Sequence, residues 1–142
     1  MTPEEKLVEL GITLPRVPAS AGTYISARTA GKLVYLAGAG GWDEKGFITG
    51  KAGLDRCIED GYAAARSCAL IHLAQLRQHL GTLNKVQEIV SLTGFVNSDP
   101  SFTQTPAVMD GASDLFVKVF GPAGRHVRTS VGVASLPDKW SC

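Results

Sequence analysis

Residues 55–80 read DRCIEDGYAAARSCALIHLAQLRQHL, and this stretch decides the fold class. Its apolar residues recur at spacings of three and four, which is typical of the buried face of an α-helix. Asp55 can cap the start of this helix, Glu59 lies in its first turns, and Gly81 stands where a left-handed stop residue belongs. We therefore expect one long helix, packed through Ile58, Tyr62, Ala65, Ala69, Leu73, Leu76 and Leu80.

Strand patterns lie on both sides of this helix. Tyr24–Ala27 and Leu33–Ala37 are expected to form a hairpin, with Gly31 in the turn that joins them. Beyond the helix, Val86–Asn97 is rich in Val, Ile and Thr, as strands are. Val127–Val133 alternates apolar and polar residues, which predicts a strand with two distinct faces.

Two further helices complete the predicted order of elements. Pro106–Phe120 offers apolar residues for packing, although Gly111 either weakens its middle or marks its true start. Pro3–Gly11 is expected to be a short helix capped by Thr2, with Glu5 three residues on. This order indicates an α+β fold, in which two helices pack on one face of a single mixed sheet beside a short N-terminal helix.

The totals are those of one globular domain spanning residues 1–142. Hydrophobic residues make up 44% and charged residues 19% of the chain, and the net charge is +1. A neutral chain without a run of Lys or Arg gives no electrostatic footprint for nucleic acid, and nothing predicts attraction to a membrane. No run of about 18 apolar residues occurs. The acidic N-terminus is not a leader, and the odd number of cysteines suggests reduced thiols in a cytoplasmic protein.

The glycine-rich segment Gly38–Gly41 follows a predicted strand, which makes it a candidate for a nucleotide-binding loop. A dinucleotide-binding fingerprint needs glycine at position 43, which is Asp43, and a helix that opens at once. A tight loop, or a loop whose N–H groups face a ligand anion, fits better. No metal site is expected, because His72 and His79 are two helical turns apart and His126 has no second ligand nearby. The pattern implies no cofactor.

Arg128 is the residue that the pattern favours most strongly as a ligand anchor. It shares a strand face with the small residues Ser130, Gly132 and Ala134, which suggests space beside its guanidinium. A guanidinium in such a place can grip a carboxylate with two parallel hydrogen bonds. An exposed arginine or a structural ion pair is the alternative that the pattern alone leaves open.

The sequence resembles the RidA/YjgF family of enamine and imine deaminases, formerly described as endoribonuclease L-PSP or translation inhibitors. The resemblance runs from about Leu10 to Pro137 and is most specific in GRHVRTSVGVASLP, residues 124–137. Gly22–Tyr24 and Leu33–Gly38 support it. One subgroup is similar in three further segments, which are GITLPRVP (11–18), GFVNSDPSFTQ (94–104) and DGASDLF (110–116).

The resemblance implies a chorismate-mutase-like sandwich that forms homotrimers with a cleft at each subunit interface. It implies hydrolysis of small 2-imino or enamine acids to 2-oxo acids and ammonia. The family's carboxylate-binding arginine falls on Arg128 and its ligand-facing backbone on Gly38. Its tyrosine falls on Tyr24, a common cysteine position on Ser130, and an asparagine on Asp110 in a loose alignment.

One part of the family pattern has no counterpart in these 142 residues. The family's water-activating glutamate and its last strand would both fall beyond Cys142. A general acid or base contributes typically about 10²–10⁴-fold to a rate, and Asp110 and Tyr24 are the candidates to replace it. The resemblance therefore leaves two main possibilities: a deaminase of the hydrolase class, or a non-catalytic member that binds small carboxylates or another protein. A ribonuclease is a third, with no basic patch to favour it.

Overall fold

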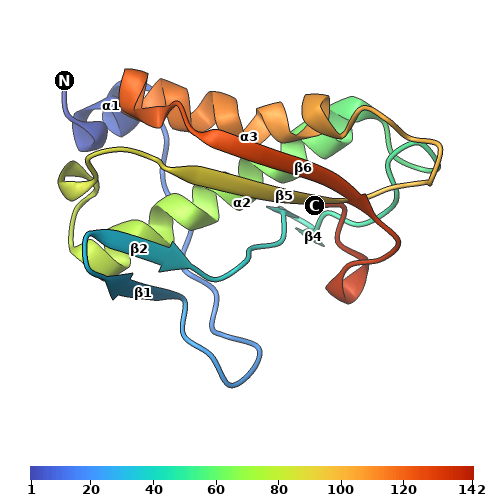
Figure 1. Cartoon of the computed structure of the whole chain (residues 1–142), viewed down its shortest axis with the longest axis horizontal. Helices are drawn as coiled ribbons and strands as arrows, with labels where there is room; N and C mark the ends of the chain where they lie inside the picture. The colour runs from blue at the N-terminus through green and yellow to red at the C-terminus, as the bar shows by residue number, and fades with distance from the viewer.

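The predicted long helix is present as α2, Ile58–Leu80, in the computed structural model, which describes residues 1–142 (Figure 1). Its C-terminal stop is confirmed, since Gly81 adopts φ 84°. The predicted cap is wrong, because the N-cap is Cys57, whose N–H donates to Asp60 Oδ2 at 3.1 Å. Asp55 belongs instead to the preceding turn, where it accepts a backbone N–H at 2.6 Å.

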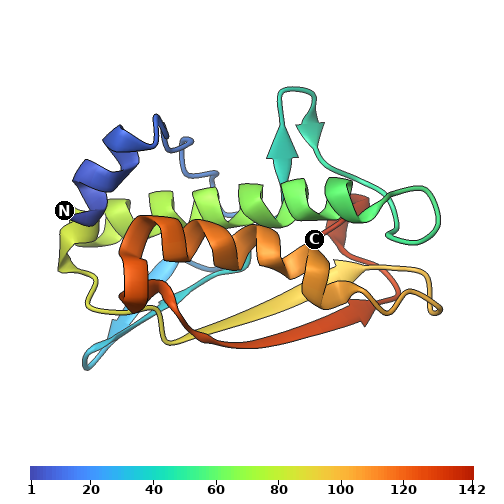
Figure 2. The ribbon, with the colours of Figure 1, turned by 90° about the horizontal axis from the view of Figure 1, so that it is seen from above.

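The second helix, α3, spans Thr105–Phe120 and packs along α2 (Figure 2). Close approach depends on glycine: a Cβ on Gly61 would lie 2.7 Å from Val108, and one on Gly111 would lie 2.1 Å from the carbonyl oxygen of Tyr62. Gly111 therefore lies within the helix as a contact point between the two helices.

Two long strands run beneath the helices. These are β5, Ser91–Asn97, and β6, Val127–Val133, which pair in parallel with Ser91 opposite Val127 (Figure 1). The face toward the helices carries Gly94 and Val96, both buried. The other face is uncovered, and it carries Phe95, Val127 and Val131, each exposed.

The hairpin is confirmed, but its first strand lies three residues later than predicted. β1 is Ala27–Ala30 and β2 is Leu33–Leu36, paired so that Ala30 faces Leu33. The turn therefore has two residues, with Gly31 at φ 60°, and so short a turn pairs the residues directly beside it. Tyr24 consequently lies in the preceding loop, where it is exposed.

The α+β class is confirmed, with one correction to the sheet. The strands form three two-stranded sheets rather than one, the third being β3, Trp42–Asp43, with β4, Gly46–Phe47. β2 and β5 share no ladder. The end of β5 is instead bonded to two other segments: Ser141 donates its N–H to Ile48 and accepts from the Asn97 N–H, and the Ala52 N–H donates to the Asn97 carbonyl, each at 2.9 Å.

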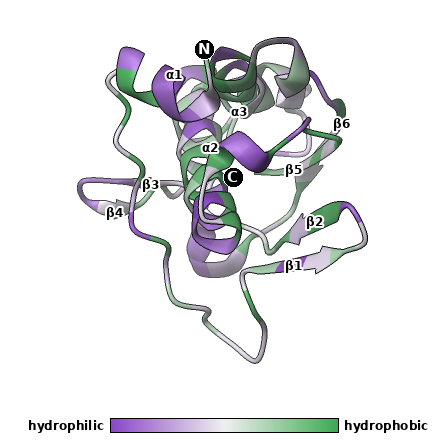
Figure 3. Ribbon diagram, turned by 90° about the vertical axis from the view of Figure 1, so that its left-hand side faces the viewer, coloured by the Kyte–Doolittle hydropathy of each residue, from purple (hydrophilic) through white to green (hydrophobic).

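The two hairpins project on opposite sides of α2 in the side view (Figure 3). The core lies between α2, α3 and the inner face of β5–β6, and its fully buried large side chains are Leu7, Leu73, Leu83, Leu115, Val96 and Val108. None of the helices is both long enough and apolar enough to cross a membrane.

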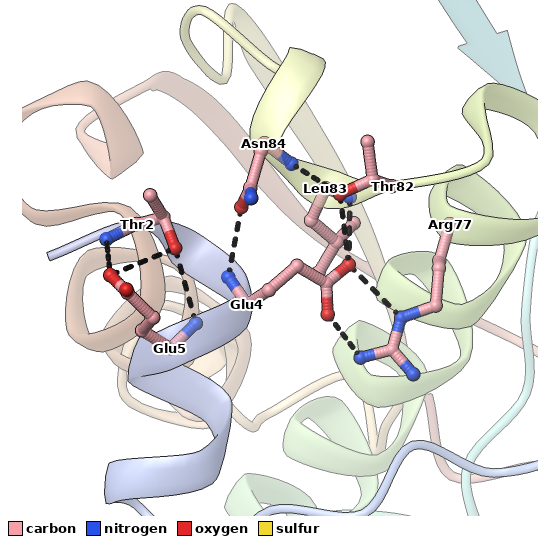
Figure 4. A network of polar contacts seen from close by, with 7 residues as sticks. All are labelled: Thr2, Glu4, Glu5, Arg77, Thr82, Leu83 and Asn84. Carbon is pink, nitrogen blue, oxygen red and sulfur yellow. Dashed lines mark hydrogen bonds and ion pairs between the residues drawn. The ribbon is translucent and has the colours of Figure 1, made fainter.

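The short helix α1, Pro3–Glu9, is joined to the end of α2 by a polar network (Figure 4). Glu4 accepts from Arg77 Nη2 at 2.6 Å and from the Leu83 N–H at 2.9 Å. Burial acts to raise the pKa of Glu4, but the Leu83 N–H and the Arg77 guanidinium outweigh it and hold that pKa below its ordinary value. The capping box of Thr2 and Glu5 is also present, as predicted.

Candidate functional site

Arg128 points from β6 toward α3, which covers the face that the sequence suggested was open. Its Nη1 donates to Asp110 Oδ1 at 2.8 Å and to Ser113 Oγ at 3.0 Å, and its Nη2 donates to the Pro106 carbonyl at 3.3 Å. The Arg128 side chain is 22% exposed and that of Asp110 is 52% exposed. The structure thus brings two predicted site residues together, and the ion pair that the pattern left open is formed.

The small residues beside Arg128 make room for the helix layer rather than for a ligand. Ser130 lies under α3, where Thr105 Oγ1 donates to its carbonyl at 3.5 Å. The Ser130 hydroxyl is buried and has no hydrogen-bond partner. A Cβ on Gly132 would lie 2.4 Å from Ser98 Oγ. The expectation of free space along this face is therefore wrong. The Arg128 side chain is partly exposed, and its partner Asp110 is the more exposed of the two.

A chain of hydrogen bonds orients the Arg128 guanidinium. His126 Nδ1 lies 2.7 Å from the Gly124 carbonyl, which can only accept, so we assign the proton to Nδ1. His126 Nε2 then accepts from Ser113 Oγ at 2.9 Å, while the same Oγ accepts from Arg128. Sequence analysis missed this chain, because Ser113 and His126 meet only when α3 crosses the start of β6.

A polar hollow surrounds these groups, lined by Lys118, Arg125, Asp110 and Asp114 as well as Arg128. Tyr62 Oη donates to Asp114 Oδ2 at 2.7 Å, and this bond to a carboxylate raises the pKa of the Tyr62 phenol above its ordinary value. Cations and carboxylates therefore lie side by side in this hollow.

Tyr24 and Gly38 lie together in a second hollow, a cavity of about 120 Å³ that shares no residue with the first. The N–H groups of Gly38, Ala39 and Gly40 donate no hydrogen bond within the chain, whereas that of Gly41 donates to the Cys142 carbonyl at 3.3 Å. Unpaired backbone N–H groups in such a loop are able to bind an anion. The role of Gly38 in ligand binding stays a prediction.

Three aromatic side chains form one wall of this cavity, and sequence analysis missed them. Phe47 lies between Trp42 and Trp140, with ring centroids 4.4 Å and 5.1 Å away. The Trp140 ring also packs on Gly40, where a Cβ would lie 2.4 Å from it. These residues come from β3, β4 and the C-terminal segment, so no local pattern in the sequence joins them.

Charge is sparse around the cavity. Asp138 is the single charged residue of its lining, and Gln75 lies on the α2 side. Gln75 Oε1 lies 2.8 Å from His72 Nδ1. Burial lowers the pKa of His72, so this imidazole is neutral at pH 7 and holds Gln75 without adding charge. No cluster of three or more His, Cys, Asp or Glu side chains in the chain could hold a metal.

The chain matches the family described as "YjgF/chorismate mutase-like, putative endoribonuclease" over residues 4–142. It belongs to the YjgF family. It is 44% identical to protein TCP17 of Trypanosoma cruzi over 133 residues, which cover 92% of this chain and 83% of that protein.

Solved structures agree with this membership. An Agrobacterium tumefaciens protein of unknown function, Atu1372, superposes with a TM-score of 0.88 at 37% identity, covering 99% of this chain and 86% of that one. A Shewanella oneidensis MR-1 protein described as "a putative endoribonuclease" superposes with a TM-score of 0.94 at 34% identity, covering 99% of this chain and 94% of that one. The expected family and fold are thereby confirmed.

Proposed function

We propose that this protein hydrolyses small 2-imino and enamine acids to 2-oxo acids and ammonia, in a site completed by two neighbouring subunits of a homotrimer. The observation that carries the proposal is the division of the site within one chain. Arg128 lies in one hollow, and the free amides of Gly38 lie in another. A carboxylate held by both groups requires the Arg128 of one subunit to face the Gly38 of the next.

Exposed apolar residues on two of the sheets support the proposed assembly. Leu33 and Tyr35 on β2 are exposed, as are Phe95, Val127 and Val131 on β5 and β6. Apolar surface of this kind on a sheet is typical of a protein interface. A heterologous contact repeated around a threefold axis closes into a ring. Each cleft of such a ring lies between two adjacent subunits, and each of these subunits contributes one half of the site.

In the proposed reaction the protein binds the substrate carboxylate, orients the substrate and transfers protons. Arg128 releases Asp110 and grips the substrate carboxylate, and the Gly38 N–H fixes its orientation. An enamine first tautomerises to the imine. Water then adds its oxygen to the C=N carbon and one of its protons moves to nitrogen. The remaining hydroxyl proton also reaches the nitrogen as the C–N bond breaks, so that ammonia leaves and C=O forms. Asp110 and Tyr24 are candidates for the proton transfer, and Asp138 joins them because its carboxylate lines the cavity.

A second candidate is a protein that binds carboxylates without turnover. It is favoured by the ion pair, in which Asp110 already accepts from the Arg128 guanidinium, and by the scarcity of acid or base groups at the cavity. RNA cleavage, the activity in the family's description, is a third candidate, for which the mixed charges around Arg128 provide no continuous basic track.

A coupled assay tests the proposal. An amino-acid oxidase generates 2-iminopropanoate or 2-iminobutanoate, and the decay of the imine is followed with and without the protein. We expect faster decay that is abolished in Arg128→Ala and retained in Arg16→Ala, where the arginine is exposed and lines neither hollow. Decay at the buffer rate, combined with a carboxylate-dependent rise in melting temperature, would support the binding protein instead.

A further inference from the structure

The aromatic wall beside Gly38 indicates which acids the site accepts. Trp42 and Phe47 of this wall are exposed, as is Tyr24 in the same cavity, and covering such side chains with apolar groups is favourable. Ligand cavities combine such apolar walls with a few polar groups that fix orientation. Here the polar groups are the unpaired N–H groups of Gly38 and Ala39.

The segment that carries Trp140 adopts a costly conformation. Asp138 and Lys139 both have positive φ, 50° and 59°, which residues with a side chain seldom adopt. The indole Nε1 of Trp140 is buried without an acceptor. Strained backbone and unpaired buried donors concentrate at functional sites, because structural positions rarely retain them. Both observations point to a role for the placement of Trp140 against Gly40.

The cavity is also large enough for a side chain. Its volume is about 120 Å³, whereas about 10–15 Å³ measured in this way is enough for one water molecule. A methyl group would leave most of this space to water, whereas a branched or aromatic group would displace the water and contact the wall. Asp138 is the single charged residue of the lining, which leaves the wall apolar beside the amides.

We propose that this cavity selects acids with a large apolar or aromatic side chain, which packs against Trp42, Phe47 and Trp140 while the carboxylate meets the Gly38 amide. The inference rests on the proposed function for the position of the carboxylate. It adds the class of substrate, namely imines derived from phenylalanine- or leucine-like amino acids rather than from alanine.

Intrinsic fluorescence measures ligand binding in the cavity, because the chain has two tryptophans and both line the cavity. We would titrate the intact protein with propanoate, 4-methylpentanoate and 3-phenylpropanoate, and with 3-phenylpropanamide to separate the carboxylate from the ring. Burial of an aromatic side chain predicts that 3-phenylpropanoate binds about 10- to 100-fold more tightly than propanoate. Equal affinity for the three acids would overturn the inference.

Substitutions in the aromatic wall test whether it causes the preference for 3-phenylpropanoate over propanoate. Trp140→Ala and, independently, Phe47→Ala are each expected to reduce the preference for 3-phenylpropanoate at least about fivefold. Trp140→Phe should retain most of it. Leu54→Ala is the matched control, because Leu54 is exposed and lies outside the cavity, and it should leave the preference unchanged. A preference that survives in both alanine variants, each shown to be folded by circular dichroism, would contradict the proposal.

The imine assay separates this inference from the proposed function. A size preference in binding without imine turnover supports the cavity assignment and removes the deaminase. Turnover with equal kcat/KM for the imines of alanine and phenylalanine supports the deaminase and overturns the cavity assignment.

Discussion

Arg128 and Asp110 form an ion pair between β6 and α3, with Nη1 2.8 Å from Oδ1. Asp110 accepts from Nη1, so a ligand carboxylate that binds this nitrogen competes with the ion pair. Both side chains remain in contact with solvent, and exposed pairs of this kind contribute about 0–1 kcal/mol. The interaction is therefore weak enough for a ligand to replace it.

Asp110→Asn removes the competing carboxylate. We expect carboxylate affinity to rise about two- to fivefold, the equivalent of a partly exposed ion pair. Calorimetric titration of both proteins with propanoate measures this change in affinity. Weaker binding in Asp110→Asn would show that Asp110 supports the guanidinium rather than competing for it. A separate fall in kcat of about 10²-fold or more would identify Asp110 as the proton-transfer group.

Ser113→Ala removes the hydroxyl that links His126 to Arg128. The guanidinium then loses one acceptor, and a bond of this type contributes about 0.5–1.5 kcal/mol. We expect carboxylate affinity to fall about two- to tenfold while the melting temperature changes little. Ser135→Ala, an exposed serine outside both hollows, is the control. If the two variants bind equally, the hydrogen-bond chain does not position Arg128.

Gly111→Ala tests the contact between α2 and α3. Alanine favours a helix by about 1 kcal/mol over glycine, but its Cβ would lie 2.1 Å from the Tyr62 carbonyl. We expect the clash to dominate and the free energy of unfolding to fall by about 1–3 kcal/mol in urea titrations. Gly38→Ala has no atom within 4 Å of the new Cβ and should change stability by less than 0.5 kcal/mol or so. A stabilised Gly111→Ala would contradict the packing.

Glu4→Gln tests the network that anchors α1. The pKa of Glu4 is held below its ordinary value by the Leu83 N–H and Arg77, against the effect of burial, so the folded state favours the ionised carboxylate. Its contribution to stability is present above the ordinary carboxyl pKa and is lost as pH falls through the lowered one. At pH 7 we expect Glu4→Gln to lower the free energy of unfolding by about 1–2 kcal/mol.

The same comparison in acid provides the control. Below the lowered pKa both proteins carry an uncharged side chain, so their unfolding curves should converge. A difference that stays constant from pH 7 to pH 3 would show that the charge of Glu4 does not stabilise the network.

Elements with strong local patterns could be predicted from the sequence. The stripe from Ile58 to Leu80 and the stop at Gly81 define α2, since helix periodicity needs no tertiary information. The first hairpin strand was misplaced because Tyr24–Ala27 and Ala27–Ala30 are both compatible with a strand. The two-residue turn at Gly31 pairs Ala30 with Leu33 and so places the strand at Ala27–Ala30. The division of the sheet depends on which backbone groups meet, and no residue pattern records this.

The sequence singles out candidate site residues, but it does not show how they are arranged. Arg128 and Asp110 are paired as neighbours, and Tyr24 and Gly38 share a cavity. Ser130 was expected beside a ligand, but its hydroxyl is buried under α3. The aromatic wall was missed because Trp42, Phe47 and Trp140 come together only through tertiary packing.

The central claim is that Arg128 of one subunit works with Gly38 of the next. Two inactive variants test it: Arg128→Ala, and Gly38→Asp, which places a carboxylate beside the free amides where nothing lies within 4 Å of the added Cβ. The measurement is imine decay after the two variants are unfolded together and refolded as mixed oligomers. In a ring with one half-site from each neighbour, random mixing restores about one quarter of the wild-type sites. We predict activity near that level, whereas no activity in the mixture, with both variants folded and assembled, would contradict a shared site.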